Sequence, residues 1–313
     1  MIISLKETAD KLMAANSLIL TAHVNPDGDA IGSCLGLKFM LEKLGKKVRV
    51  LIDDDLPKFL SVLPGIDTIE KPENESYEAD YLVILDASLD RVGSVIEKCK
   101  APRLNIDHHR TNDEKADFLY LDAKRAATCE IIYELGKEMG VEFDINSATS
   151  IYTGLATDSG YFRYSNTTPH TMRAAAELME TGIRPEKISE AIETKDFDVV
   201  QGMAKALQTI ELHADGRVAG LFLDHELTES LDTTEGFIDQ VRVIDGVDVA
   251  ILLKAVEPEV CRVSMRSKKT DVAKIAESLG GGGHIRAAGC TIEKPFSQAK
   301  TDILKVIEES LAE

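Results

Sequence analysis

Apolar residues in the first half of the chain form short runs that alternate with segments of helical spacing. Strands are expected at residues 17–24, 46–53, 80–86 and 103–107, and helices at residues 30–45 and 128–140. Both helical segments end at a glycine, Gly45 and Gly140, as helices often do. Because short apolar strands separated by helices are typical of a parallel sheet, the pattern predicts an α/β fold with a doubly wound, mainly parallel sheet.

The pattern changes after about residue 205, where strands follow one another with few helices between them. A hairpin is expected around Asp215 and Gly216. Further strands are expected at 247–256, 261–267 and 287–293, and one helix at 271–279. We therefore expect a smaller α+β domain with a mixed sheet. The expected division of the chain is 1–185 for the first domain, 186–206 for a helical linker and 207–313 for the second domain.

The composition is that of an ordinary globular protein, with 44% hydrophobic and 29% charged residues in a chain of 313 residues. The sequence has no apolar run of about 20 residues, which a membrane-spanning helix needs, and its first residues lack the basic-then-apolar order of a signal peptide. Its five cysteines are odd in number and contain no Cys-x-x-Cys pair, which argues against a disulfide framework. We therefore expect a cytoplasmic protein without a membrane partner.

The formal net charge of −18 disfavours binding of long duplex nucleic acid, because phosphate contacts usually require a basic surface. The charge does not exclude a small phosphorylated ligand, since a bound cation or a local basic patch can override the sign of the whole chain. One such patch lies at residues 262–286, where six basic and two acidic side chains give a net charge of +4.

Acidic and imidazole side chains recur where the expected strands and helices end. They are His23, Asp27 and Asp29 in the stretch HVNPDGDA, Asp86, the letters DHH at 107–109, and Asp158. Taken alone, Asp27 and Asp29 could equally be turn or helix-cap residues, a lone aspartate at a strand end usually is one, and a lone histidine is usually a structural polar side chain. Together they would lie at the carboxyl edge of one parallel sheet, where such sheets bind ligands.

Several carboxylates and imidazoles at one sheet edge repel or desolvate one another unless cations join them. Oxygen and imidazole donors without thiolates favour Mn²⁺ first, with Mg²⁺ or Co²⁺ as alternatives. The number of donors exceeds the needs of one ion, which favours two divalent cations about 3.5–4 Å apart. Such a pair activates water and clamps a phosphoryl group.

A second cluster of candidate residues lies near the carboxyl terminus. The stretch GGGGH at 280–284 follows a helix, and Arg262, Ser264 and Arg266 alternate along one strand and so share a face. A helix stop and a solvated strand face would explain these features without any function. As a functional site, the glycine backbone and the guanidinium groups would bind a phosphate that does not react.

These motifs resemble those of the DHH phosphoesterase superfamily. The resemblance rests on HVNPDGDA, LD at 85–86, DHH and TD at 157–158, and continues in CRVSMRS and GGGGHIRAAG, which are similar to the DHHA1 domain. It covers nearly the whole chain and is greatest for the nanoRNase/pAp phosphatase group. The first domain is then the DHH catalytic domain and the second the DHHA1 substrate-binding domain.

The resemblance also assigns roles to individual residues. The implied metal ligands are His23, Asp27, Asp29, Asp86, His108 and Asp158. Asp86 would bridge two Mn²⁺ ions, with His23 and Asp27 on one ion and the remaining three ligands on the other. His109 would face the scissile phosphate, and Asp107 would orient an imidazole. The residues expected to bind substrate are Arg262, Ser264, Arg266, Gly281, Gly282, Gly283, His284, Arg125 and Arg163.

The implied function is hydrolysis of very short single-stranded oligoribonucleotides to mononucleotides and of 3′-phosphoadenosine 5′-phosphate (pAp) to AMP. Such an enzyme is both an exoribonuclease and a 3′(2′),5′-bisphosphate nucleotidase. An alternative substrate is cyclic di-AMP or its linear product pApA. Less favoured alternatives are an inorganic pyrophosphatase, for which the glycine-rich domain would have no use, and a non-catalytic nucleotide sensor. The oligomeric state is left open, with a homodimer as one candidate.

Overall fold

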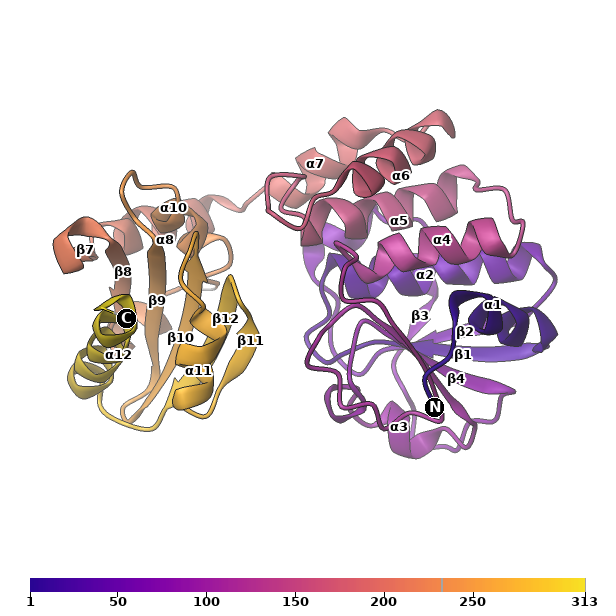
Figure 1. Cartoon of the computed structure of the whole chain (residues 1–313), viewed down its shortest axis with the longest axis horizontal. Coiled ribbons are helices and arrows are strands. Elements are labelled where there is room, and N and C mark those ends of the chain that lie inside the picture. The colour runs from indigo at the N-terminus through magenta and orange to yellow at the C-terminus, as the bar shows by residue number, and fades with distance from the viewer. Residues whose placement is uncertain (232, 313) are drawn as a thin grey trace. The chain divides into compact units, whose positions relative to one another are not determined.

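The computed structural model describes residues 1–231 and 233–312, and its contacts divide the chain into two compact units (Figure 1). Unit 1 runs from Met1 to Thr194, and unit 2 begins at Lys195. The boundary lies inside the segment expected to be a linker. Helix α7 (Pro185–Glu193) packs with unit 1, and helix α8 (Phe197–Leu207) packs with unit 2, because each has an apolar face.

Unit 1 is built on a six-stranded sheet in which all strands run parallel. Its strands are β1 (Ser17–Thr21), β2 (Lys47–Leu51), β3 (Ile69–Glu70), β4 (Tyr81–Leu85), β5 (Arg103–Asp107) and β6 (Phe118–Leu121). Its other α-helices are α1 (Leu5–Ala14), α2 (Gly28–Lys43), α3 (Val95–Lys98), α4 (Thr128–Glu138), α5 (Ile145–Asp158) and α6 (Pro169–Glu180). The predicted parallel α/β sheet is confirmed.

The strand order β3-β2-β1-β4-β5-β6 places the reversal of chain direction between β1 and β4. From β1 the chain moves toward one edge of the sheet, and from β4 it moves toward the other. In sheets of this kind the loops that leave the carboxyl ends at the reversal form the ligand site. Those loops carry the stretch HVNPDGDA after β1 and Asp86 after β4.

The two faces of this sheet are covered differently. One face packs against the long helices α2, α4 and α5, and the other against the short helix α3 and connecting loops (Figure 1). Neighbouring residues of β1 alternate between the two cores, since Leu18 and Leu20 join the first and Ile19 joins the second. Burial on both faces explains why the strands read as continuous apolar runs.

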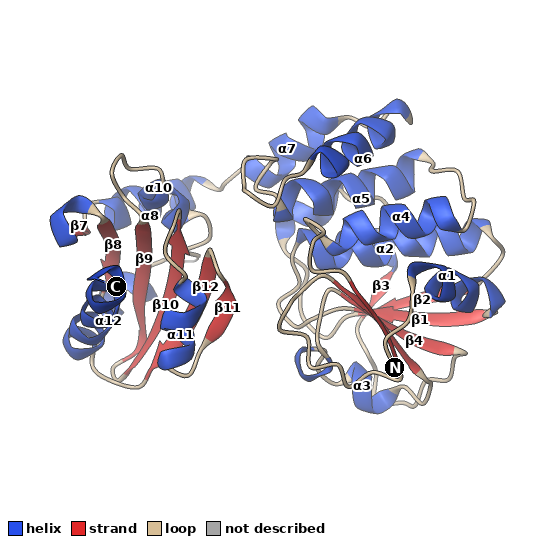
Figure 2. Cartoon of the chain, in the orientation of Figure 1, coloured by secondary structure: helices blue, strands red, loops and turns tan. Residues whose placement is uncertain are grey.

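Unit 2 contains a mixed six-stranded sheet of order β11-β12-β10-β9-β8-β7, which confirms the predicted α+β domain (Figure 2). The strands are β7 (Ile210–His213), β8 (Val218–Leu223), β9 (Val249–Glu257), β10 (Val260–Ser267), β11 (Gly282–His284) and β12 (Ala287–Ile292). The helices besides α8 are α9 (His225–Glu229), α10 (Phe237–Arg242), α11 (Val272–Ser278) and α12 (Phe296–Ala312). Among the described strands of this sheet, β8 and β9 pair in parallel and the other neighbours pair antiparallel. The predicted hairpin turns at Asp215 and Gly216, whose φ angles of 55° and 82° are left-handed.

Helices cover one face of the unit 2 sheet more fully than the other. One face packs against α11 and α12 across β9, β10 and β12. On the opposite face, α8 and α10 pack against β8 and β9, whereas β10, β12 and β11 lie beyond this apolar cluster. Arg262, Ser264 and Arg266 lie on this second face.

Two further features concern the whole described chain. Among the described residues, no helix combines the length and the apolar character needed to cross a bilayer. All five cysteines are buried and carry free thiols.

Candidate metal centre

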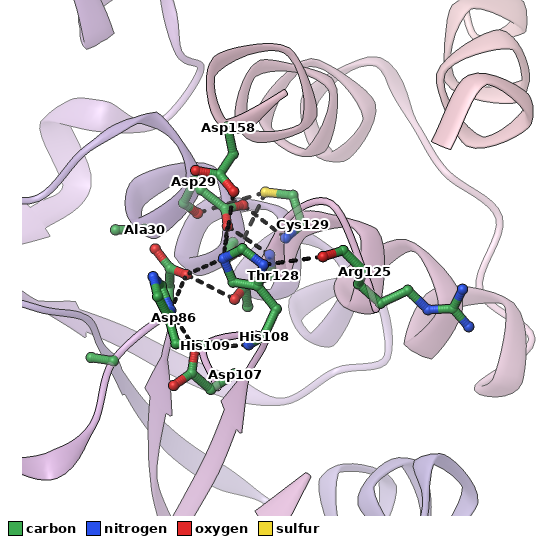
Figure 3. A network of polar contacts seen from close by, with 12 residues as sticks. Asp29, Ala30, Asp86, Asp107, His108, His109, Arg125, Thr128, Cys129 and Asp158 are labelled. Atoms are coloured by element: carbon green, nitrogen blue, oxygen red, sulfur yellow. Dashed lines mark hydrogen bonds and ion pairs between the residues drawn. The ribbon is translucent and has the colours of Figure 1, made fainter. Parts of the chain in front are cut away.

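The six side chains expected to bind metal gather at the carboxyl edge of the unit 1 sheet (Figure 3). They come from the loop after β1 (His23), the start of α2 (Asp27 and Asp29), the loops after β4 (Asp86) and β5 (His108), and the end of α5 (Asp158). Within the described part of the chain, candidate ligand atoms that lie within 4.8 Å of one another form three groups. They are His23, Asp27 and Asp86; Asp29, His108 and Asp158; and Asp86, His108 and His109, which shares a residue with each of the others. Figure 3 shows Asp29, Asp86, His108 and Asp158 pointing toward one another.

The first group consists of His23, Asp27 and Asp86. The Nε2 atom of His23 lies 3.6 Å from Oδ2 of Asp86 and 3.9 Å from Oδ2 of Asp27. These separations exceed ordinary hydrogen-bond lengths, so the three donors converge without bonding directly to one another.

The second group consists of Asp29, His108 and Asp158, and Asp86 connects it to the first. The Nε2 atom of His108 lies 3.4 Å from Oδ2 of Asp158 and 3.9 Å from Oδ2 of Asp29. It also lies 3.5 Å from Oδ1 of Asp86, whose other oxygen faces His23. Asp86 therefore presents one carboxylate oxygen to each group.

Both imidazoles are oriented by backbone carbonyls. The Nδ1 atom of His23 lies 2.9 Å from the carbonyl oxygen of Val24, and that of His108 lies 3.2 Å from the carbonyl oxygen of Arg125. A carbonyl only accepts hydrogen bonds, so Nδ1 carries the proton and the Nε2 lone pair faces the carboxylates. This is the arrangement that metal-binding histidines adopt in proteins.

Two of the aspartates also cap helices. Oδ1 of Asp27 accepts hydrogen bonds from the backbone N–H groups of Asp29 and Ala30 at the start of α2, which leaves Oδ2 directed toward His23. Both oxygens of Asp29 accept N–H groups at the start of α4, from Thr128 at 2.6 Å and Cys129 at 2.8 Å. The capping and metal-binding interpretations are therefore compatible, because the two uses occupy different lone pairs.

Electrostatics at this edge favour a bound cation. Burial raises the pKa of Asp86 well above its usual range, and the nearby carboxylates of Asp29, Asp27 and Asp158 raise it further. Burial also raises the pKa of Asp158 to about 8, although His108 opposes the shift. Burial alone would lower the pKa of His108, but the carboxylates of Asp158 and Asp29 raise it overall. The four carboxylates and two oriented imidazoles thus fit divalent cations of the hard-to-borderline type.

His109 and Asp107 lie beside this cluster. Oδ1 of Asp107 accepts the backbone N–H groups of His108 and His109, and it lies 2.7 Å from Nδ1 of His109. Asn112 donates to the other oxygen of Asp107 at 2.6 Å. Burial of Asp107 raises its pKa, but the hydrogen bonds and charge of His109 outweigh burial and leave that pKa below its usual value. The Asp107 carboxylate therefore fixes the orientation of the His109 ring.

The side chains of Arg125 and Arg163 do not join the cluster. The Arg125 guanidinium forms ion pairs with Asp122 and Glu134, at 3.2 and 2.7 Å, and points away from the aspartates (Figure 3). The Nε–H of Arg163 donates to the carbonyl of Gly160. The ion pairs of Arg125 offset its charge, and a role of this side chain in substrate binding stays a prediction.

In unit 2, five of the predicted substrate-binding residues, Arg262, Ser264, Arg266, Gly282 and His284, lie in adjacent rows on one face of the sheet, whereas Gly283 pairs with Ala288 on the other face. Strand pairing places Arg262 opposite Lys254, Ser264 opposite Gly289, and Arg266 opposite Ala287. The same pairing places Gly282 and His284 of β11 on the rows of Ser264 and Arg266. Two of these rows continue into the apolar cluster, since Ser264 pairs with Leu252 and Arg266 with Ala250, so the polar and glycine positions border that cluster.

The fold requires glycine at positions 280, 281 and 283 for different reasons, and it does not require glycine at position 282. Gly280 has a left-handed φ of 76°, and Gly283 has a φ of 143°. A Cβ atom at Gly281 would lie only 2.2 Å from the carbonyl oxygen of Gly289. A Cβ atom at Gly282 would meet nothing within 4 Å. Folding therefore requires three of these glycines, and Gly282 is the one whose identity the fold leaves unexplained.

Two residues that contact or neighbour these sites escaped the sequence analysis. Thr128 donates to Asp86 and Asp29, and no local pattern connects it to positions 42 and 99 residues away. Lys254 is half-buried beside Arg262, and burial lowers its pKa, with the charge of Arg262 lowering it further. The sequence feature that could have identified Lys254 is its place inside the apolar run AILLKAV, because a buried lysine without an acidic partner is rare.

Comparison with known proteins agrees with the two-unit architecture. Residues 17–155 match the description "DHH family, N-terminal domain", and residues 217–313 match the description "DHHA1 domain". A protein from Thermus thermophilus named bifunctional oligoribonuclease and PAP phosphatase NrnA is 34% identical, covering 94% of this chain and 90% of its own. The protein of the same name from Bacillus subtilis is 29% identical, covering 88% and 90%. The crystal structure of an exopolyphosphatase-related protein from Bacteroides fragilis is 26% identical with a TM-score of 0.87, covering 98% and 95%.

Proposed function

The chain belongs to the DHH family, and we propose that it hydrolyses very short oligoribonucleotides to mononucleotides and pAp to AMP. The observation that carries this proposal is the convergence of four carboxylates and two imidazoles at one sheet edge. The names of the Thermus thermophilus and Bacillus subtilis relatives support the choice of substrates. The acidic chain and its basic patch at residues 262–286 support a small phosphorylated substrate over long duplex nucleic acid.

We propose two divalent cations as cofactors, with Mn²⁺ as the preferred ion. His23 and Asp27 would hold one ion, Asp29, His108 and Asp158 the other, and Asp86 both. When bound, such a pair stabilises negative charge on a phosphoryl oxygen and activates a water molecule. The protein's own contribution is to hold the donors in place before substrate arrives, through the carbonyl contacts of the two imidazoles and the buried position of Asp86.

His109 is proposed to act on the substrate through its Nε2 atom. Its Nδ1 atom is held by Asp107, which leaves Nε2 as the atom that moves a proton or stabilises a phosphoryl oxygen. The His109 side chain is 21% exposed, whereas that of His108 is only 7% exposed, so His109 is the more accessible of the two imidazoles.

The face of the unit 2 sheet that carries Arg262, Ser264 and Arg266 is proposed to bind the phosphate that does not react. Arg262 and Lys254 lie opposite each other, and within the described residues neither forms an ion pair with a carboxylate. Two neighbouring cations without an acidic partner repel one another, and an anionic ligand would relieve this repulsion. Arg266 and the backbone of Gly282 lie on adjacent rows of the same face.

Replacing Gly282 with alanine is expected to raise KM for pAp by about 10-fold while kcat stays within about twofold, because the added methyl group obstructs a phosphate without touching the metal cluster. The melting temperature should not fall, since a Cβ atom at this position meets nothing within 4 Å. Steady-state kinetics and thermal unfolding of the purified variant give both values.

Gly280→Ala is the contrasting variant for that measurement. Its φ of 76° strains any residue with a Cβ atom, so this variant should lose about 1 kcal/mol of stability. An unchanged KM in Gly282→Ala would show that the phosphate does not approach this glycine.

The substrate proposal is tested by comparing turnover of pAp, a 5′-phosphorylated diribonucleotide, a 20-residue oligoribonucleotide, cyclic di-AMP and pyrophosphate at equal concentration. We expect rapid turnover of the first two and little of the others. Equal rates on the diribonucleotide and the 20-residue oligonucleotide would contradict the preference for short substrates. If only cyclic di-AMP or only pyrophosphate is hydrolysed, the proposed metal site would stand but the proposed substrates would be rejected.

A further inference from the structure

Three of the six candidate ligands, His108, Asp29 and Asp86, are contacted by a short segment that itself contributes no ligand. The segment 125–129 connects β6 to the first turn of α4. The carbonyl of Arg125 faces His108 Nδ1, and the N–H groups of Thr128 and Cys129 donate to Asp29. Asn166 donates to the carbonyls of both Ala126 and Asp158, at 3.0 and 3.1 Å.

Thr128 makes two of these contacts by itself. Its hydroxyl donates to Oδ1 of Asp86 at 2.9 Å, and its backbone N–H donates to Oδ2 of Asp29 at 2.6 Å (Figure 3). The residue is fully buried, so water cannot replace either hydrogen bond. Asp86 belongs to the group around His23, and Asp29 belongs to the group around Asp158. Thr128 thus connects the two groups through a single residue.

The segment itself is firmly anchored. The carboxylate of Glu130, which is 1% exposed, accepts the N–H of Ala126 at 2.6 Å. Its other oxygen accepts the hydroxyl of Thr171 from α6 at 3.0 Å. A buried carboxylate that ties the segment to a second helix limits the positions that Thr128 can adopt.

The backbone conformation of Asp86 is unusual, so contacts with neighbouring residues must hold this residue in place. Asp86 has a left-handed φ of 58°, which is uncommon for a residue with a side chain and is maintained only by its surroundings. Its backbone N–H donates to the carbonyl of Ile106 at 3.1 Å, which fixes the main chain. The hydrogen bond from the Thr128 hydroxyl to Oδ1 restricts the rotation of the carboxylate itself.

We infer that Thr128 is a positioning residue that orients Asp86 and Asp29 for simultaneous binding of two divalent cations. The inference rests on the metal sites of the proposed function, and it names a residue that no ligand motif includes. An ionised Asp86 carboxylate can only accept hydrogen bonds, so the Thr128 hydroxyl donates its proton to Oδ1 of Asp86. The other lone pairs of the Asp86 carboxylate stay available to cations. Residues in this position usually change metal affinity or activity by about 10- to 100-fold when removed.

The test is a calorimetric titration of the purified, metal-free full chain with Mn²⁺ alone, without any substrate. Thr128→Val removes the hydroxyl, keeps the backbone N–H and preserves the side-chain shape. We expect it to weaken Mn²⁺ binding by about 10- to 100-fold. Thr128→Ser retains the hydroxyl and should bind Mn²⁺ within about threefold of the original chain, whereas a purely steric role would make Ser the worse replacement.

Thr153→Val is the matched control. Thr153 is equally buried, but its hydroxyl donates to the carbonyl of Thr149 within α5 and not to any candidate ligand. This variant should bind Mn²⁺ like the original chain. If Thr128→Val does not fold, as judged by circular dichroism, Thr128→Ala and Thr153→Ala replace the pair with the same expectation.

Each result separates this inference from the proposed function. Equal Mn²⁺ affinity in Thr128→Val and the original chain would overturn the role of Thr128, whatever the substrate. Failure of the original chain to bind Mn²⁺ would overturn both the inference and the metal sites. Weaker binding in Thr128→Val together with no turnover of pAp or oligoribonucleotide would retain the inference and reject only the substrates.

Discussion

Asp86→Asn should lower kcat for pAp by about 10³-fold or more, which corresponds to a loss of roughly 4 kcal/mol of transition-state stabilisation. Asp86 is 1% exposed and presents one oxygen to His23 and the other to His108. Asparagine keeps the shape of the side chain but replaces one charged oxygen with a donor NH₂ group, so it cannot serve two cations. Steady-state hydrolysis of pAp with saturating Mn²⁺ measures the effect.

The choice of asparagine separates chemistry from folding. Asparagine tolerates the left-handed conformation that Asp86 adopts, whereas alanine would add backbone strain to the loss of the carboxylate. Asp90→Asn is the matched control, because Asp90 is exposed four residues later and interacts with Ser88 rather than with the cluster. Turnover by Asp86→Asn within threefold of the Asp90→Asn rate would rule out the shared role of Asp86.

Removal of divalent metal with EDTA should abolish turnover and lower the melting temperature, and Mn²⁺ should restore both. Without cations, the cluster holds four neighbouring carboxyl groups, among them Asp86 and Asp158, whose pKa values are raised mainly by burial. At a free Mn²⁺ concentration of 100 times Kd, one site adds about 2.7 kcal/mol to the free energy of unfolding. Thermal unfolding in EDTA and in Mn²⁺ measures the difference.

The stabilisation by Mn²⁺ should grow between about pH 4 and pH 8. A carboxyl group with a raised folded-state pKa favours the protonated form, so the metal-free chain loses stability as pH rises from the unfolded pKa, near 4, through the folded value. For Asp158 that folded value is about 8. Mn²⁺ binds the ionised carboxylate, so its advantage increases over the same interval. Asp158→Asn should reduce this dependence, and a melting-temperature difference that does not vary with pH would contradict the explanation.

Much of the fold could be predicted because the strands of unit 1 are buried on both faces. The strand expected at 103–107 is β5 with the same bounds, and that expected at 80–86 contains β4. The strand expected at 17–24 ends earlier, at Thr21, because the chain leaves the sheet to form the turn that carries His23. A continuous apolar run does not show where pairing stops.

Some elements were missed although local signals were present. Helix α1 follows a capping box between Ser4 and Glu7, and α6 begins at Pro169, directly after its N-cap residue Thr168. Strand β6 is a short edge strand, so its four residues carried little pattern. In these cases short length and partial burial weakened the hydrophobic periodicity on which the prediction depended.

The candidate ligands were recognisable because strand ends are marked in the sequence, but their supporting contacts were not. Asp86 and Thr128 meet only because β4 lies beside β1 and α4 packs against α2. The glycine run at 280–283 was interpreted as one phosphate-binding loop. Three of its glycines are instead required by the fold, through positive φ angles or lack of space for a Cβ atom. Tertiary packing decides both questions, and no local pattern encodes it.

The most direct test is the release of AMP from pAp by the purified full chain, measured by chromatography with Mn²⁺, with EDTA, and with Asp86→Asn in Mn²⁺. We expect AMP from the original chain in Mn²⁺, none above background in EDTA, and a rate about 10³-fold lower for Asp86→Asn. AMP released at the same rate in EDTA or by Asp86→Asn would contradict a metal-dependent reaction at this cluster. Absence of AMP from the Mn²⁺-loaded chain would contradict pAp as a substrate.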